Sequence, residues 1–327
     1  MIQTLSALQT VHAPIAAELE RVEHRFSEEL GSNFSFVNEL CERVQRYRGK
    51  MLRPTLVLLT GRACGGVSED HVTIAAVVEM VHVATLIHDD VLDEAGVRRG
   101  QATINAREGN QAAVLLGDYL MSHAFHLVAG LDDPYAARRM AATTNTVCEG
   151  ELMQVHHRAD VHLSEEQYFE IISRKTAALT ATCCELGARY AGVSADQVTA
   201  WERFGADVGV AFQIADDVLD YTGSEDQMGK TLGRDLELGE PTLPTIHALR
   251  HADPAVRQEL SSVLGNGHSI PRRRICAWLE AAGSLEYSHR VAHGYISRAR
   301  DHLLGLPRSP ARDALLLATD FMIRRAQ

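Results

Sequence analysis

The sequence lacks the motifs by which several common enzyme classes are recognised. It contains no GxSxG nucleophile elbow, no phosphate-binding P-loop and no HExxH zinc motif. Its six cysteines form no CxxC pair and no spacing typical of a metal site, which favours reduced thiols in a cytoplasmic protein. A reaction that depends on a nucleophilic serine, a P-loop or a zinc-bound water is therefore not expected.

Long apolar runs and flexible linkers are also absent. Charged residues or histidines interrupt every apolar run before it reaches the ~18 to 20 residues that span a bilayer. The chain begins without the basic start and apolar core of a signal peptide. No stretch rich in Pro, Gly or Ser divides the 327 residues. We therefore predict one domain over residues 1–327, no membrane span, and at most peripheral contact with a membrane.

The pattern of apolar residues is that of helices. Alternation of apolar and polar residues is essentially absent, whereas Leu8, Val11, Ile15 and Leu19 follow the helical period. Turn signals rich in Gly, Pro and Ser separate the helical stretches. Hydrophobic residues make up 46% of the chain, and a net charge of −11 argues against nucleic acid as a partner. We predict an all-α protein of ten or more helices.

An acidic pentad, DDVLD, occurs twice. Residues 89–93 and residues 216–220 are identical, and an apolar helical stretch precedes each copy. Asp89 and Asp93 share one helical face, so their charges repel each other unless a cation is present. Oxygen-only ligands favour a hard ion such as Mg²⁺, and two acidic helices facing each other could hold a metal cluster bridged by a polyphosphate. The alternative is a pair of solvated acidic helix faces.

Basic residues lie close to both pentads in the sequence. Lys50 and Arg53 stand at a predicted helix start, where backbone N–H groups and the helix dipole also favour anions. Any one basic pair is more typical of solvated surface, but their positions together predict a diphosphate site. The others are Arg98 and Arg99, which follow the first pentad, and Lys175 and Lys230, which flank the second.

These motifs resemble the trans-prenyltransferase (polyprenyl diphosphate synthase) family over nearly the whole chain. The order of the two pentads, with RRG behind the first and KT between them, is highly specific for that family. The matching segments are GKMLRP (49–54), EMVHVATLIHDDVLDEAGVRRG (79–100), LLGDYL (115–120), EGELMQ (149–154), RKTAAL (174–179), FQIADDVLDYTG (212–223), and GKTLGRDL with PTLP (229–244).

The resemblance implies antiparallel helices around a central cavity, usually in a homodimer, with the two pentads facing each other across its mouth. It also implies three Mg²⁺ ions in each active site. By this likeness the principal metal ligands are Asp89, Asp93 and Asp216, and the supporting ones are Asp90, Asp217 and Asp220.

The family joins isopentenyl diphosphate head-to-tail to an allylic diphosphate, here expected to be farnesyl or geranylgeranyl diphosphate. Mg²⁺ and cationic side chains neutralise the leaving diphosphate, so the allylic C–O bond ionises to a carbocation that isopentenyl diphosphate attacks. The resemblance assigns isopentenyl diphosphate to Lys50, Arg53, His82 and Arg99, and the allylic diphosphate to Arg98, Lys175, Thr176, Gln213 and Lys230. The residues expected to carry catalysis are Asp89, Asp93, Asp216, Lys175 and Arg98.

One residue departs from the family pattern near this site. Glu240, in LGEPTLP, stands where the family commonly carries a Lys. An acidic side chain cannot bind a diphosphate as a Lys does. We therefore expect that contact to be lost and the affinity for the allylic diphosphate to be lowered.

Product length in the family depends on the residues four, five and eight positions before the first Asp, where short-chain enzymes commonly carry an aromatic plug. Here these residues are Thr85, Ala84 and Val81, all of them small. The first pentad also lacks the insertion seen in bacterial short-chain enzymes. We expect an all-trans medium- or long-chain product, longer than geranylgeranyl diphosphate. The cavity floor would then lie on the helix that holds Met121, Phe125 and Val128, and the alternative is that these three are ordinary core residues.

Three alternatives remain open from the sequence. A short-chain farnesyl or geranylgeranyl diphosphate synthase would share every motif except those that set product length. A class I terpene cyclase would carry an NSE-type motif in place of the second DDVLD and would lack Lys50, Arg53 and His82. A non-catalytic subunit would have lost Asp or Arg residues, whereas both pentads and RRG are intact here.

Overall fold

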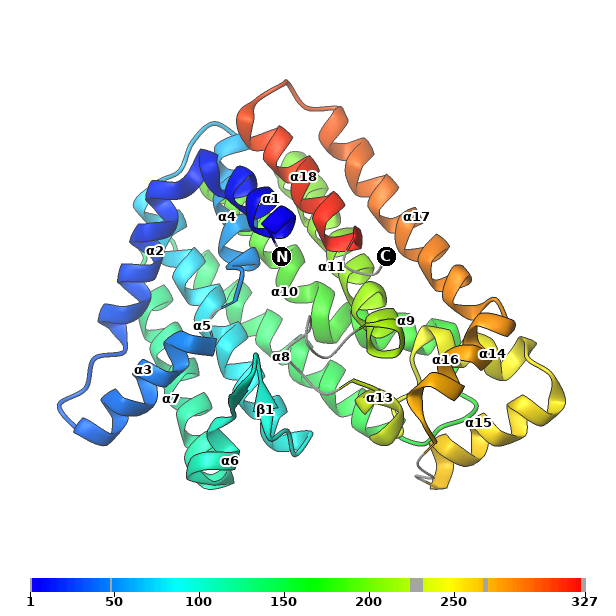
Figure 1. The fold of residues 1–327 in the computed structure, drawn as a ribbon. Helices are drawn as coiled ribbons and strands as arrows, with labels where there is room; N and C mark the ends of the chain where they lie inside the picture. Colours follow the sequence, from blue (N-terminus) through cyan, green and yellow to red (C-terminus); the bar gives the residue numbers. More distant parts are fainter. Residues whose placement is uncertain (1, 48, 224–231, 267–269, 325–327) are drawn as a thin grey trace. The chain divides into compact units, whose positions relative to one another are not determined.

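The computed structural model of the chain describes residues 2–47, 49–223, 232–266 and 270–324 (Figure 1). The regular structure in these ranges is helical apart from two short strands, which confirms the all-α prediction and its ten or more helices. The helices group into two compact units that interleave along the chain, and the single domain over residues 1–327 stays a prediction. Unit 1 comprises residues 1–144, 179–205 and 302–318, and unit 2 comprises residues 145–178, 206–301 and 319–327.

Unit 1 holds the N-terminal helices complete and parts of several later ones. The complete helices are α1 (Ile2–His12), η1 (Ala13–Ile15), α2 (Ala16–Glu29), α3 (Ser35–Tyr47), α4 (Leu52–Ala63), α5 (Glu69–Leu92), α6 (Ile104–Glu108) and α7 (Asn110–Ala129). The shared helices are α8 (Tyr135–His156), α10 (Ala178–Tyr190), α11 (Ala195–Thr222), α17 (Ser284–Leu304) and α18 (Pro310–Arg324).

Helix α5 forms the centre of unit 1 and packs against α2, α4 and α7 (Figure 1). Its side chains are apolar around most of the helix, and Ile74, Val77 and Met80 are all completely buried. Ser68 begins the helix with a capping box, in which the Ser68 backbone N–H donates to His71 Nδ1 at 3.0 Å. The helix that carries the first pentad is therefore held by the unit's core along most of its length.

Unit 2 is organised around the C-terminal part of α11. Ile214 and Val218, one turn apart on α11, belong to two separate buried clusters. One cluster contains Tyr168 and Leu243, and the other contains Leu260. Val218 is itself part of the second pentad, so the pentad is built directly into this core. The complete elements of unit 2 are α9 (Glu165–Ile172), the π-helical turn η2 (Ser173–Ala177), α13 (Arg234–Glu237), α14 (Leu243–His251), α15 (Pro254–Asn266) and α16 (Arg272–Ala281).

A small hairpin that the sequence pattern did not indicate follows the first pentad. Strands β1 (Val97–Arg98) and β2 (Gln101–Ala102) pair antiparallel, with Arg98 opposite Gln101. The two residues of the turn, Arg99 and Gly100, both have positive φ, 52° and 73°, as tight hairpin turns require. Strands of two residues are too short to show an alternating pattern, which is why only a turn was predicted here.

Two described helices, α5 and α7, are long and apolar enough to cross a membrane by length and composition. The most apolar stretch of α5 is 78% buried inside the protein, as expected of a core helix, whereas that of α7 is 33% buried. Histidines and aspartates interrupt both helices, which is why the sequence pattern does not indicate an unbroken apolar run.

Candidate active site

Both acidic pentads lie at the C-terminal ends of long helices. The first occupies the last turn of α5, with Asp93 as the C-cap residue. The second lies close to the end of α11 at Thr222. A helix C-terminus carries a partial negative charge, so carboxylates there are disfavoured unless cations lie beside them. The positions of the pentads thus add a second reason, besides their spacing, to expect bound cations.

The pentad carboxylates fall into two groups by burial. One group is partly exposed and accessible to a ligand, and the other is buried and hydrogen-bonded to the protein. The same division separates the principal from the supporting ligands expected from the resemblance, although their roles stay a prediction. Asp89, Asp93 and Asp216 are partly exposed, whereas the exposed fractions of Asp90, Asp217 and Asp220 are 1%, 4% and 1%.

In unit 1, the buried Asp90 holds Arg98 of the hairpin. Nε of Arg98 donates to Asp90 Oδ1 at 2.7 Å, and Nη2 of Arg98 lies 2.7 Å from the same oxygen. The Asn105 amide donates to the backbone oxygen of Asp90 at 2.9 Å. Arg98, predicted as a contact of the allylic diphosphate, therefore ties the hairpin to α5 and fixes the turn that carries Arg99.

The positive charges of three arginines act on the imidazole of His82. Burial and then the charges of Arg53, Arg99 and Arg98 lower the pKa of His82 well below its usual value. A neutral imidazole offers a hydrogen bond without adding charge. The structure thus gathers three of the residues predicted to hold isopentenyl diphosphate, Arg53, His82 and Arg99, in unit 1.

Lys50 and Arg53 lie at the start of α4, as the sequence predicts. This helix begins without a side-chain cap, and its N-cap residue Met51 has a left-handed backbone with φ of 50°. Such a conformation is strained for a bulky residue and is found most often at functional sites. The N–H groups of a first helical turn, combined with adjacent cations, suit an anionic ligand.

Gly49 lies directly against the guanidinium of Arg99. A Cβ atom at position 49 would lie 2.4 Å from Arg99 Nη2, closer than any real contact. A larger residue at position 49 would therefore push the Arg99 guanidinium aside from its present place. This contact joins two motifs that are 50 residues apart in the sequence.

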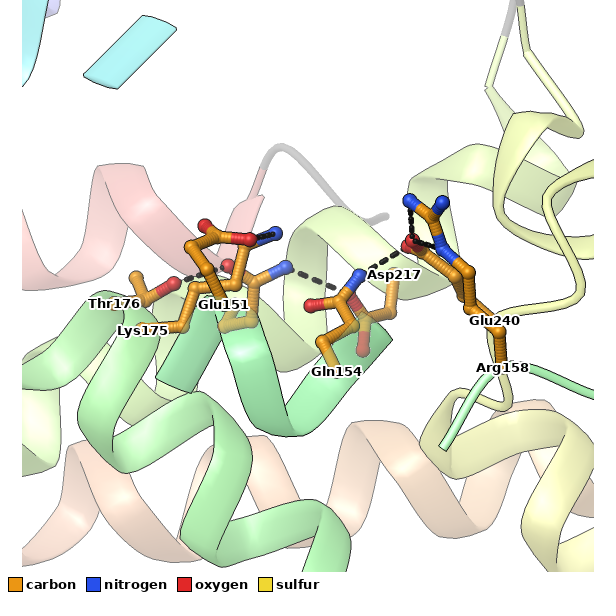
Figure 2. Close-up of polar contacts among 8 residues, drawn as sticks. Glu151, Gln154, Arg158, Lys175, Thr176, Asp217 and Glu240 are labelled. Atoms are coloured by element: carbon orange, nitrogen blue, oxygen red, sulfur yellow. Dashed lines mark hydrogen bonds and ion pairs between the residues drawn. The ribbon is translucent and has the colours of Figure 1, made fainter. Parts of the chain in front are cut away.

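In unit 2, hydrogen bonds connect the KT segment to the second pentad (Figure 2). Thr176 Oγ1 donates to Gln213 Oε1 at 2.7 Å, and Gln213 Nε2 donates to Asp217 Oδ1 at 2.8 Å. The Tyr168 hydroxyl donates to Asp217 Oδ2 at 2.5 Å. Burial raises the pKa of Asp217 to about 6, and the two hydrogen bonds act in the opposite direction. Both oxygens of Asp217 are thus engaged within the protein.

Lys175 and Thr176 lie in the π-helical turn η2 between α9 and α10. A π-turn redirects its side chains relative to a regular helix and is frequent at functional sites. Lys175 Nζ lies 2.9 Å from Glu151 Oε2 on α8 (Figure 2). The close approach depends on Gly150, where a Cβ would lie 2.5 Å from the backbone nitrogen of Lys175.

Glu240, the departure from the family pattern, is buried and paired. Its Oε1 accepts hydrogen bonds from Arg158 Nε and Nη2 at 3.1 and 2.9 Å, and its Oε2 accepts from the Gln154 amide (Figure 2). Glu240 is therefore held by the end of α8. Lys230, predicted to contact the allylic diphosphate, lies outside the described residues.

The three residues predicted to set product length lie on α5. Val81 and Ala84 are buried in unit 1, with 1% and 0% exposed. Thr85 is partly exposed, and its hydroxyl donates to the backbone oxygen of His82 at 2.8 Å. No bulky side chain therefore occupies these positions on the helix that leads to Asp89.

The donor atoms of the pentads are those that Mg²⁺ prefers, because all of them are carboxylate oxygens. In the described ranges, no group of three His, Cys, Asp or Glu side chains is arranged to hold a metal by itself. One reason is that Asp90 is engaged by Arg98, and Asp217 by Tyr168 and Gln213. Each pentad thus supplies part of a coordination shell, which fits an ion whose other ligands are water or phosphate oxygens.

Two residues of this site were not predicted from the sequence. Tyr168 lies seven residues before Lys175, a spacing that is equally typical of an ordinary core residue. Arg158 follows the EGELMQ segment in a turn that has no recognisable signal. Their partners, Asp217 and Glu240, are 49 and 82 residues away, so only the folded chain reveals the contacts.

A helical protein with two aspartate pentads and adjacent basic residues has the features of enzymes that act on diphosphate esters. The family model "Polyprenyl synthetase" matches residues 35–274. The octaprenyl diphosphate synthase of Escherichia coli is 35% identical over 320 residues, which cover 97% of this chain and 99% of that one. A short chain isoprenyl diphosphate synthase from Methanothermobacter thermautotrophicus is 36% identical over 281 residues, 85% of this chain and 86% of its own.

A solved structure gives the same result. The polyprenyl synthase of Caulobacter crescentus, crystallised with calcium and isoprenyl diphosphate, matches with a TM-score of 0.93 and 31% identity over 97% of both chains. The chain therefore belongs to the polyprenyl synthetase family and has its isoprenoid synthase fold. It is a prenyltransferase, of a family that uses isopentenyl diphosphate, an allylic diphosphate and a divalent metal.

Proposed function

We propose that this enzyme condenses isopentenyl diphosphate with farnesyl or geranylgeranyl diphosphate to give an all-trans medium- or long-chain polyprenyl diphosphate. The observation that carries the proposal is the pair of identical pentads at helix C-termini, each with basic residues in its own unit. In this proposal, residues 1–327 form one domain.

The metal in this proposal is Mg²⁺, with three ions in each active site. Asp89, Asp93 and Asp216 would be its principal ligands because their carboxylates are partly exposed. The buried Asp90, Asp217 and Asp220 would act as supporting ligands. Bound Mg²⁺ would neutralise negative charge on the leaving diphosphate.

The residues of unit 1 would hold isopentenyl diphosphate. Lys50 and Arg53 at the start of α4, with Arg99, would bind its phosphate oxygens by charge-assisted hydrogen bonds. Burial and its cationic neighbours keep His82 neutral. It would therefore add a hydrogen bond to the diphosphate without adding a positive charge beside the arginines. Because these side chains supply positive charge themselves, they would bind isopentenyl diphosphate without a bridging metal.

The residues of unit 2, together with Arg98 of unit 1, would hold the allylic diphosphate. Lys175 would neutralise charge on it, and Thr176 and Gln213 would orient it while also fixing Asp217. Arg98, bonded to Asp90, and Lys230 complete the predicted set. Catalysis would rest on positioning and charge stabilisation by Asp89, Asp93, Asp216, Lys175 and Arg98, and no side chain is assigned as nucleophile or base.

Product length in the proposal follows from the small residues on α5. Val81, Ala84 and Thr85 leave no aromatic plug on the helix before the first pentad. The octaprenyl relative covers 97% of this chain and the short-chain relative 85%, at nearly equal identity. Both observations favour a product longer than geranylgeranyl diphosphate.

Helix α7 supports the proposal of a homodimer. It exposes the neighbouring apolar residues Val114 and Leu115, which are 41% and 60% accessible. Exposed apolar residues on a helix whose most apolar stretch is only 33% buried suit burial against a second copy of the chain. We also propose a cytoplasmic enzyme with at most peripheral membrane contact, in keeping with its six free cysteines.

The direct test is incubation of the pure protein with Mg²⁺, labelled isopentenyl diphosphate and farnesyl diphosphate. Incorporation of label into an extractable prenyl chain is the expected result. A cyclic hydrocarbon without label would instead indicate a class I terpene cyclase. A folded protein that transforms neither substrate would indicate a non-catalytic subunit.

Replacing Arg53 with Ala should separate the two substrate sites. The loss of a charge-assisted hydrogen bond costs about 2 kcal/mol, so the KM for isopentenyl diphosphate should rise about 30-fold. The KM for the allylic substrate should change little. The matched control is Arg62→Ala, on the same helix but paired with Glu18. Equal increases in both KM values would contradict the assignment of Arg53.

A further inference from the structure

The segment 232–240 is anchored at its first end to the second pentad. The backbone nitrogen of Gly233 donates to the backbone oxygen of Asp220 at 3.1 Å. The backbone nitrogen of Asp235 donates to Asp220 Oδ2 at 3.4 Å. The last carboxylate of the pentad is therefore oriented by this segment, within unit 2.

The other end of the segment is anchored to the end of α8. The backbone nitrogen of Ala159 donates to the Gly239 oxygen at 2.7 Å. Next to this bond, Arg158 donates twice to Glu240, and Gln154 donates to the other carboxylate oxygen (Figure 2). The segment thus connects Asp220 to α8 through a backbone contact and an ion pair.

The ion pair is the part of this anchor that depends on side-chain charge. Glu240 is 8% exposed, and a carboxylate at that depth is costly unless a cation and hydrogen bonds compensate it. Gln154 lies one turn after Glu151 on α8, and Glu151 pairs with Lys175. Displacement of Glu240 would therefore disturb α8 at the place where it contacts Lys175, as well as Asp220.

We propose that Arg158 and Glu240 are a positioning pair for the allylic diphosphate half of the site. Their opposite charges hold segment 232–240 on α8 and so place both Asp220 and the α8 face that contacts Lys175. The inference rests on the proposed function. It reverses the expectation drawn from the sequence, because Glu240 acts here as the required partner of Arg158, and a lone Lys at position 240 would face a second cation.

Charge reversal tests the pair directly. Glu240→Lys and Arg158→Glu alone should each raise the KM for the allylic diphosphate about tenfold or more, because each sets like charges side by side. The KM for isopentenyl diphosphate should stay within about threefold. The double variant, Arg158→Glu with Glu240→Lys, restores opposite charges and should return the allylic KM to within about threefold of wild type.

A matched control comes from the same unit. Asp207→Lys breaks the ion pair with Arg298, whose Nη2 lies 2.8 Å from Asp207 Oδ1, and should leave both KM values unchanged.

Binding can also be measured without turnover, as the rise in the melting temperature of the protein caused by inorganic pyrophosphate with Mg²⁺. That rise should shrink in both single variants and recover in the double variant.

Several outcomes would contradict the proposal that Arg158 and Glu240 are a positioning pair. A lower allylic KM in Glu240→Lys would show that a cation at 240 simply binds diphosphate. A double variant as impaired as the single ones would show that opposite charges are not what matters. If the reversals do not fold, Glu240→Gln keeps the side-chain size without the charge, and an unchanged allylic KM in it would also refute the proposal. Incorporation of label by the wild type tests the proposed function separately.

Discussion

Asp89→Asn and Asp216→Asn should each reduce turnover with Mg²⁺ by at least ~10³-fold, equivalent to about 4 kcal/mol in the activation barrier. Both residues are partly exposed carboxylates at helix C-termini, in different units. If each pentad supplies only part of the coordination around a bridging diphosphate, neither can replace the other. The measurement is steady-state incorporation of labelled isopentenyl diphosphate over a range of Mg²⁺ concentrations.

The fold should tolerate both changes, because neither carboxylate is buried. Circular dichroism should show unchanged helical content. Asp118→Asn on α7 and Asp207→Asn on α11 serve as controls for a lost carboxylate in each unit, and both should retain activity. Near-normal turnover in either pentad variant at saturating Mg²⁺ would show that the two pentads do not share one metal cluster.

The helical fold could be predicted from the sequence because its signal is local. A period of 3.6 residues marks the buried side of each helix, and the turn residues mark the ends. The hairpin after the first pentad could not be predicted in this way, since its strands have two residues each. The π-turn that contains Lys175 could not be predicted either, because a single turn of five residues is too short to show a period of its own.

The residue types of the candidate site could be predicted, but not their individual tasks. The two pentads and the basic motifs are short, local patterns. Their division into exposed and buried carboxylates depends on tertiary packing, since Asp90 and Asp217 are buried by contacts with Arg98 and Tyr168. The role of Glu240 could not be predicted from the sequence, because its partner Arg158 lies 82 residues earlier in the chain.

Ala84→Phe should convert the enzyme to a short-chain synthase. Ala84 is completely buried on α5, five residues before Asp89, and Val81 lies one turn before it. If the growing prenyl chain extends along this helix from the pentad, a ring at position 84 would block it after a few isoprene units. The ring could move aside only by straining a close-packed wall, at a cost of about 1 to 3 kcal/mol. The chain should therefore be released early.

Chromatography of the dephosphorylated products measures this effect. Wild type should give a product longer than geranylgeraniol, and Ala84→Phe should give mainly shorter alcohols at a similar rate of isopentenyl diphosphate consumption. Thr85→Phe, at a partly exposed position one residue later, provides a second obstruction if the buried ring prevents folding. A wild-type product of geranylgeranyl length or less, or identical product distributions in wild type and both variants, would show that α5 does not set the length. A shortened product in both variants would support a growing chain along α5, because two rings at neighbouring positions would then have blocked the same path.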